Sequence, residues 1–173
     1  FLPGVSFEDI NLEIEKRDNT GELLFLPYIN GTNAPEFDST ASGLFMGLKT
    51  RHDAYDMAAA VMEGVALLLN RTLESLSKKP VSIISTGGGA KSPLWLQMKA
   101  DITGIQVNVP EDKEAALLGA AIMGAVTAGI FENYEAAVAV GVRMEKTYTP
   151  RPYNEAKKQA YNIMYDAMIK AQY

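Results

Sequence analysis

The stretch Ser85-Thr86-Gly87-Gly88-Gly89-Ala90-Lys91-Ser92-Pro93 decides the fold class of this chain. Its first two residues end the apolar segment 81–86, which predicts a buried β-strand. The residues after it show the apolar spacing of a helix. Ser92 is a favourable N-cap, and Pro93 is a favourable first residue of a helix. The stretch therefore predicts a strand that passes through a glycine turn directly into a helix.

The three glycines at 87–89 make this turn a candidate site for a phosphate. Without side chains, the backbone can approach a ligand closely and can adopt positive φ angles. The following helix adds oriented N–H groups and a partial positive charge, which together favour an anion. Neither the Walker A spacing nor a GxGxxG pattern is present, so a plain tight turn is the alternative interpretation. Ser92 could contact a ligand or only cap its own helix.

Helices and strands are expected to alternate on both sides of the turn. Apolar spacing predicts a helix over 53–77 that starts at the N-cap Asp53 and stops before Pro80. After the turn we expect a helix from Ser92 to Gly104, a strand over 106–109 and a helix over 112–128. Shorter helices are expected near 133–140 and over 154–172. This alternation predicts an α/β fold class.

Two of these helices carry apolar faces with different expected neighbours. In the helix over 112–128, six residues are expected to face a core, namely Leu117, Leu118, Ala121, Ile122, Ala125 and Val126. In the helix over 154–172, one face is expected to pack on its own domain, formed by Ala160, Tyr161, Met164, Tyr165 and Met168.

The first 50 residues carry turn signals and little helical periodicity. Residues 1–30 are expected to be extended, with an apolar strand at 23–26 and turns at 19–21 and 30–31. Residues 32–50 are rich in Gly, Ser, Thr, Asn and Pro, and they predict a long connection. No linker divides the chain, so we expect one domain over 1–173.

Composition excludes several classes of protein. Of the 173 residues, 47% are hydrophobic and 21% are charged, which is typical of a globular domain and not of a disordered one. The net charge of -5 argues against nonspecific nucleic-acid binding. The absence of cysteine excludes disulfides, thiolate metal sites and a cysteine nucleophile in this chain, and it fits a cytoplasmic location. No apolar run reaches the ~18 residues of a membrane span.

The other candidate residues have simpler explanations. His52 is the only histidine, so a capping or surface role is favoured over catalysis and no histidine-based metal cluster exists. Lys91 could meet a phosphate or stay solvated. The acidic residues within 111–114 suit a helix N-terminus without a metal. Gly64 inside a helix costs about 1 kcal/mol relative to alanine, which predicts close packing against it.

Several short segments before and after the glycine turn, each present once, form a characteristic series along the chain. These are Phe25–Gly31, Ala34–Pro35, Gly43–Leu48, Val61–Ala66, Gly87–Trp95, Gln97–Asp101 and Glu114–Ala121. Their order and spacing resemble the C-terminal domain of the FGGY carbohydrate kinases, a family that includes xylulokinase, gluconokinase and glycerol kinase. The resemblance covers most of the chain, from about residue 23 to 153. It implies an actin-like, ribonuclease H-like ATPase fold, with a mixed sheet flanked by helices, in which two such domains close over ATP and a sugar.

The resemblance also implies roles for individual residues. The cofactor-binding residues would be Gly87, Gly88, Gly89, Ala90 and Ser92. Gly88 would lie against the nucleotide phosphates and Ser92 toward the adenine, with ATP and Mg²⁺ as cofactors. The segment Glu114–Ala121 would be a connecting helix whose small residues let the domains hinge. No catalytic residue is assigned to this chain, because the family's aspartate base lies in the N-terminal domain, and a second phosphate motif is expected before Phe1.

The implied activity is transfer of the γ-phosphoryl group of MgATP to a sugar hydroxyl. A pentulose such as xylulose is favoured as the acceptor. Thr32-Asn33 stands where many xylulokinases have Glu-Arg, so a related pentulose or polyol kinase remains open. The expected partners are the sugar and the N-terminal domain of the same kinase, with no nucleic acid and no membrane, and a homodimer is left open. The chain alone is expected to lack kinase activity.

Two alternatives to a kinase domain are considered. One is a noncatalytic module that only binds nucleotide or mediates assembly. The other is a different actin-like ATPase, such as an acyl-CoA dehydratase activator. The second is disfavoured because those activators hold an iron–sulfur cluster with cysteines, and this chain has none.

Overall fold

Helices and strands alternate along the chain in the predicted α/β order. The computed structural model describes residues 2–17, 22–32, 37–112 and 114–171. The first half contains α1 (Phe7–Glu15), β1 (Leu24–Leu26), β2 (Leu44–Met46), α2 (Ala54–Glu74) and β3 (Ile83–Ile84). The second half contains the 3₁₀-helix η1 (Gly88–Ala90), α3 (Pro93–Thr103), β4 (Val107–Pro110), α4 (Ala115–Thr127), α5 (Tyr134–Gly141), β5 (Met144–Tyr148) and α6 (Glu155–Lys170).

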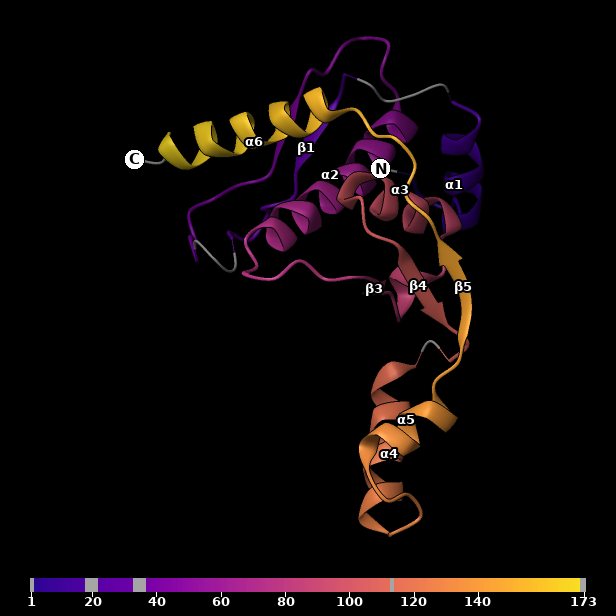
Figure 1. The fold of residues 1–173 in the computed structure, drawn as a ribbon. Helices are drawn as coiled ribbons and strands as arrows, with labels where there is room; N and C mark the ends of the chain where they lie inside the picture. The colour runs from indigo at the N-terminus through magenta and orange to yellow at the C-terminus, as the bar shows by residue number, and fades with distance from the viewer. Residues whose placement is uncertain (1, 18–21, 33–36, 113, 172–173) are drawn as a thin grey trace.

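Two helices, α2 and α3, pack on each other at the centre of the molecule (Figure 1). Helix α1 contacts α2, while the antiparallel pair of β1 and β2 lies between α2 and α6. A second sheet follows below, in which β3 is parallel to β4 and β4 is antiparallel to β5. This small sheet is mixed, as expected, and it connects the central helices to the pair formed by α4 and α5.

The C-terminal helix closes the main core from one side. Tyr161, Met164 and Tyr165 of α6 are buried in one cluster with Leu24 and Leu26 of β1. The expectation that this helix packs on its own domain is therefore confirmed.

Gly64 allows β1 to lie directly against the backbone of α2. A Cβ atom at Gly64 would lie 2.3 Å from the carbonyl oxygen of Phe25, far inside van der Waals contact. The close packing expected at Gly64 is confirmed.

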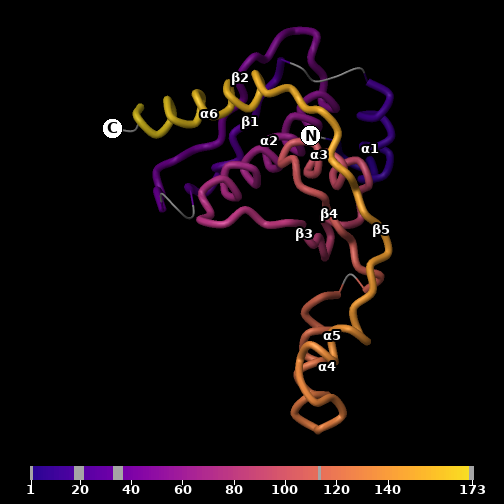
Figure 2. Tube along the Cα trace, viewed as in Figure 1, coloured from indigo at the N-terminus to yellow at the C-terminus, as the bar shows by residue number. Residues whose placement is uncertain are grey.

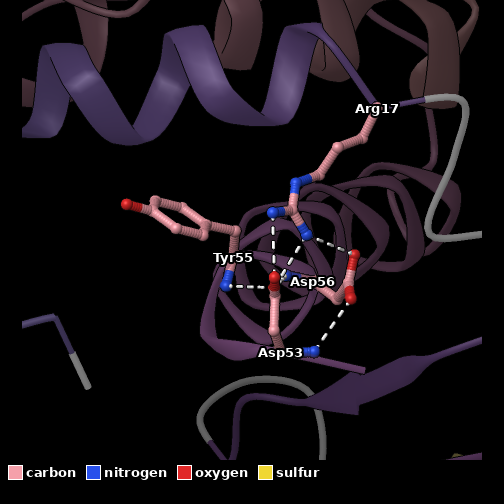
Figure 3. Close-up of polar contacts among 4 residues, drawn as sticks. All are labelled: Arg17, Asp53, Tyr55 and Asp56. Carbon is pink, nitrogen blue, oxygen red and sulfur yellow. Dashed lines mark hydrogen bonds and ion pairs between the residues drawn. The ribbon is translucent and has the colours of Figure 1, made fainter. Parts of the chain in front are cut away.

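The N-terminus of α2 is fixed by a cluster of polar side chains (Figure 3). Asp53 accepts hydrogen bonds from the amides of Tyr55 and Asp56, and the Asp56 carboxylate accepts one from the Asp53 amide. Such a capping box satisfies amides that the helix itself leaves free. Arg17, just beyond α1, donates to Asp53 at 2.7 Å and to Asp56 at 3.1 Å. The predicted N-cap is confirmed, and it also holds the end of α1.

The N-terminal third departs from the expected extended structure. Residues 7–15 form α1, because Ser6 caps the helix by accepting the amide of Asp9, and Ile14 is buried. The connection expected over 32–50 contains β2, which pairs with β1 in the register Leu24 opposite Met46. The turn at 30–31 is confirmed by the positive φ of Gly31, whereas the turn at 19–21 falls outside the described residues.

The strand before the glycine turn is shorter and more exposed than predicted. Only Ile83–Ile84 pair with a neighbour, Val81 is 96% exposed and Ile84 is 57% exposed. The reason is that β4 is the only strand beside β3 within the described part of the chain. The predicted strand is therefore confirmed at 83–84, whereas its length and its burial over 81–86 were predicted wrongly.

The helix α4 also lies outside the core that was expected for it. Leu117 is 72% exposed, and none of the residues of α4 is buried. Figure 2 shows that α4 and α5 stand apart from the other helices, and α4 packs on α5. The six apolar residues expected in a core are thus at the surface or half-buried in this chain.

Candidate functional site: the glycine turn

The glycine turn leaves the end of β3 and enters α3 through one short 3₁₀-helix. Gly87 has φ +68° and ψ -157°, a conformation that favours glycine. The amides of Ala90 and Lys91 donate to the carbonyls of Gly87 and Gly88 at 3.1 and 3.2 Å. The amides of Gly88 and Gly89 precede these bonds and have no acceptor inside the short helix. They are the donors that the turn can offer to a ligand.

The two faces of the turn differ. A Cβ atom built on Gly87 or Gly88 meets no other atom within 4 Å, so this face is open. A Cβ atom on Gly89 would lie 3.4 Å from both the Lys99 ammonium and the Trp95 ring. The backbone of Gly87 and Gly88 is therefore open on the side where a side chain would lie, whereas Gly89 packs against Trp95 and Lys99 of α3.

Ala90 and Ser92 have structural roles in this arrangement. Ala90 is buried and packs in one cluster with Leu96 and Val107. The Ser92 hydroxyl accepts a hydrogen bond from the Trp95 amide at 3.2 Å, which is the capping role considered as the alternative. A nucleotide-binding role for Gly87, Gly88, Gly89, Ala90 and Ser92 stays a prediction.

A small cavity of about 150 Å³ lies beside the turn. Its lining includes Lys91, Pro93, Glu145, Lys146 and Tyr148, from the turn and from β5. Lys91 is exposed, and the Lys146 ammonium lies 4.9 Å from the ring centre of Tyr148. The cavity thus places two lysines and the carboxylate of Glu145 next to the glycine turn.

A third lysine lies on the side of the turn that faces α3. The Lys99 ammonium is 3.4 Å from the Gly89 carbonyl oxygen and 4.1 Å from the centre of the Trp95 ring. Burial lowers the pKa of Lys99. The sequence alone predicted no contact for Trp95 or Lys99. Their separation of four residues was the signal that could have found this contact.

The remaining candidates do not form a second site. The Nδ1 atom of His52 accepts the amide of Lys49 at 3.0 Å in the turn before α2, whose N-cap is Asp53, so His52 stabilises a turn and does not cap the helix. Asp112 accepts the amide of Glu114 at the start of α4. Among the residues that the structure describes, no cluster of three or more His, Cys, Asp or Glu side chains could hold a metal. In the same residues, no helix has the length and hydropathy needed to cross a membrane.

The sequence of this chain is similar to those of carbohydrate kinases. The family model described as the C-terminal domain of the FGGY family of carbohydrate kinases matches residues 7–128. A xylulose kinase of Staphylococcus epidermidis is 33% identical over 98% of this chain and 35% of its own length. A gluconokinase of Bacillus subtilis is 34% identical over 93% of this chain and 32% of its own length.

The fold is shared with solved structures of the same kinds of kinase. The ligand-bound xylulose kinase of Lactobacillus acidophilus superposes with a TM-score of 0.76 at 26% identity, over 98% of this chain and 34% of that one. The predicted actin-like ATPase fold is confirmed. The chain spans about a third of the length of the curated relatives it matches.

Proposed function

We propose, because this chain belongs to the FGGY family of carbohydrate kinases, that it forms the nucleotide-binding part of an ATP-dependent sugar kinase. The observation that carries the proposal is the open glycine turn, where a Cβ atom on Gly87 or Gly88 would meet no other atom within 4 Å. Phosphate groups are anions that such amides bind well. Lys91 and Lys146 beside the turn add charge of the right sign.

The chemistry proposed for the full-length kinase is transfer of the γ-phosphoryl group of ATP to a sugar hydroxyl. Such transfers depend mainly on positioning and on stabilisation of charge. This chain would hold and orient the nucleotide, while the rest of the kinase supplies the general base and the sugar contacts. Mg²⁺ would arrive with the phosphates of ATP, because the described residues offer no acidic cluster of their own.

A direct test of the nucleotide site uses Gly88 in the full-length kinase. Gly88→Asp should fold normally, since a Cβ atom at this position meets open space. Its carboxylate should raise the Kd of ADP at least about tenfold by repelling the phosphates. Gly88→Ala should weaken binding less, through size alone. Gln159→Glu adds the same charge on the exposed face of α6 and should leave the affinity unchanged. Unchanged affinity in Gly88→Asp would favour a noncatalytic module.

The substrate proposed for the kinase is a pentulose such as xylulose. Support comes from relatives named xylulose kinase, although a gluconokinase is equally similar over almost the same residues. The test is an ADP-release assay on the full-length kinase with D-xylulose, L-xylulose, L-ribulose, gluconate, glycerol and L-rhamnulose. Selective turnover of D-xylulose would support the proposal, and selective turnover of gluconate or glycerol would overturn it.

We also propose that α4 is the connecting helix between this chain and the rest of the kinase. Apart from the side that packs on α5, its apolar side chains are exposed in the described structure, and its glycines Gly119 and Gly124 leave open space for a neighbouring backbone. In the full-length kinase the amides of α4 should exchange with deuterium more slowly than in this chain alone. Equal exchange rates would argue against this contact.

A further inference from the structure

The side of the glycine turn that faces α3 holds a cation in an unusual setting. Lys99 belongs to the last half of α3, and its side chain extends along the helix toward the turn. Its ammonium lies 3.4 Å from the Gly89 carbonyl oxygen and 4.1 Å from the centre of the Trp95 ring. A cation over the face of an indole is attracted by the electrons of the ring. The side chain therefore has two specific contacts that fix where its charge lies.

Trp95 is itself fixed in place. Its indole N–H donates to the carbonyl oxygen of Met62 in α2 at 2.8 Å, so the ring cannot rotate freely under the ammonium. The same ring lies 3.4 Å from the position of a Cβ atom on Gly89. A continuous series of contacts thus runs from α2 through Trp95 and Lys99 to the glycine turn.

The charge of Lys99 is only partly compensated. Burial lowers its pKa, and no carboxylate within the described residues opposes that effect. A half-buried ammonium in this state is stabilised by any anion that binds nearby. Gly89, which the ammonium contacts, directly follows the open face formed by Gly87 and Gly88.

We propose that Lys99 is a positioning residue of the nucleotide site: its ammonium holds the Gly89 carbonyl against α3 and adds positive charge behind the turn that receives the phosphates. The inference rests on the proposed nucleotide-binding function. The hydrogen bond directs the Gly89 carbonyl, which would repel an anion, toward Lys99 of α3. The charge then acts on the phosphates through the turn, without direct contact.

The test compares Lys99 variants of the full-length kinase by calorimetric titration with ADP and with adenosine. Lys99→Met keeps the aliphatic packing on Trp95 and removes the charge. It should raise the Kd of ADP about tenfold, as expected for a lost interaction of a charged group. The Kd of adenosine and the KM of the sugar should change less than about twofold, because neither carries phosphate. Lys99→Arg retains the charge and should bind ADP within about threefold of the original enzyme.

Three outcomes would overturn the inference. They are an unchanged Kd of ADP in Lys99→Met, an equal loss in Lys99→Arg, and an equal loss of adenosine affinity, which would indicate a packing role only. If Lys99→Met does not fold, Lys99→Gln serves in its place, because it is neutral but can still donate to Gly89, and a loss larger than that of Lys99→Arg is expected. Gly88→Asp, measured in parallel, separates the two proposals. If it weakens ADP binding while Lys99→Met does not, the nucleotide site stands and only the role of Lys99 is wrong.

Discussion

The carboxylate of Glu63 in α2 lies 2.5 Å from the ammonium of Lys157 in α6. Both residues are buried, with 7% and 6% of their surface exposed, and they lie 94 positions apart in the chain. The Tyr153 hydroxyl donates to the same carboxylate at 2.6 Å, and burial together with that negative charge raises the pKa of Tyr153. Burying two charges costs desolvation that their attraction only partly offsets. The pair therefore specifies where α6 docks more than it adds net stability.

Removal of one partner should be costly. Lys157→Met leaves the Glu63 carboxylate buried, with the Tyr153 hydrogen bond but without the ammonium. We expect the free energy of unfolding to fall by about 3 kcal/mol. Urea denaturation followed by circular dichroism measures this change through the midpoint at constant slope.

The neighbouring Lys158 supplies the matched control. It pairs with Glu155, whose side chain is largely exposed. Lys158→Met should cost less than about 1 kcal/mol, as for other ion pairs at a surface. Equal losses in Lys157→Met and Lys158→Met would contradict the special role of the buried pair.

A second prediction concerns the contact between α2 and β1. Gly64→Ala should destabilise the chain, although alanine is the better helix former, because the new methyl group would lie 2.3 Å from the Phe25 carbonyl oxygen. Overpacking of this kind costs about 1–3 kcal/mol. Gly119→Ala in α4 meets open space and should instead stabilise this chain by up to about 1 kcal/mol. Thermal unfolding of both variants checks the opposite signs, and a gain in Gly64→Ala would refute the close contact.

The helices α2 and α3 were predictable because several local signals agree at their ends. Asp53 and Ser92 are N-caps as expected, and Gly104 ends α3 in the left-handed conformation that favours glycine. The failures occur where burial depends on distant neighbours. α4 is apolar on every side, which is typical of a buried helix, yet among the described residues only α5 packs on it. At the candidate site, the three glycines after the apolar segment predicted the turn. The burial of Lys99 could not be predicted, because it depends on Trp95, whose ring is hydrogen-bonded to α2.

A third prediction separates the two roles of Asp53. Asp53→Ser retains a hydroxyl that can cap α2 but loses the ion pair with Arg17, whereas Asp53→Ala loses both. The alanine variant should lose about 1 kcal/mol through the cap, and the serine variant should lose less. Equal losses in the two variants would mean that the cap contributes nothing measurable.

The ion pair of Arg17 with Asp53 should also depend on pH. The hydrogen bond from Arg17 lowers the pKa of Asp53 in the folded chain. The unfolded chain therefore takes up this proton first, so the stabilisation is present above about pH 4 and is lost as pH falls through the folded pKa. Arg17→Gln should be less stable than the original chain at pH 7 by under about 1 kcal/mol, because the pair is largely exposed. Urea midpoints of the two chains should converge toward pH 3, and a constant difference would refute the linkage.

The last prediction concerns the chain of 173 residues by itself. We expect it to bind ADP weakly and to release no ADP from MgATP in the presence of a sugar, because phosphoryl transfer needs a positioned acceptor as well as a positioned nucleotide. The described residues offer the open glycine turn, and they contain no acidic cluster that could hold the metal. The measurement is a coupled ADP-release assay with D-xylulose, beside a titration with ADP that reports on the turn. Binding of ADP without turnover of the sugar would support the proposal that this chain holds the nucleotide and the rest of the kinase supplies the base and the sugar contacts. Sugar-dependent turnover would place the base and the acceptor site within this chain, contrary to the proposal.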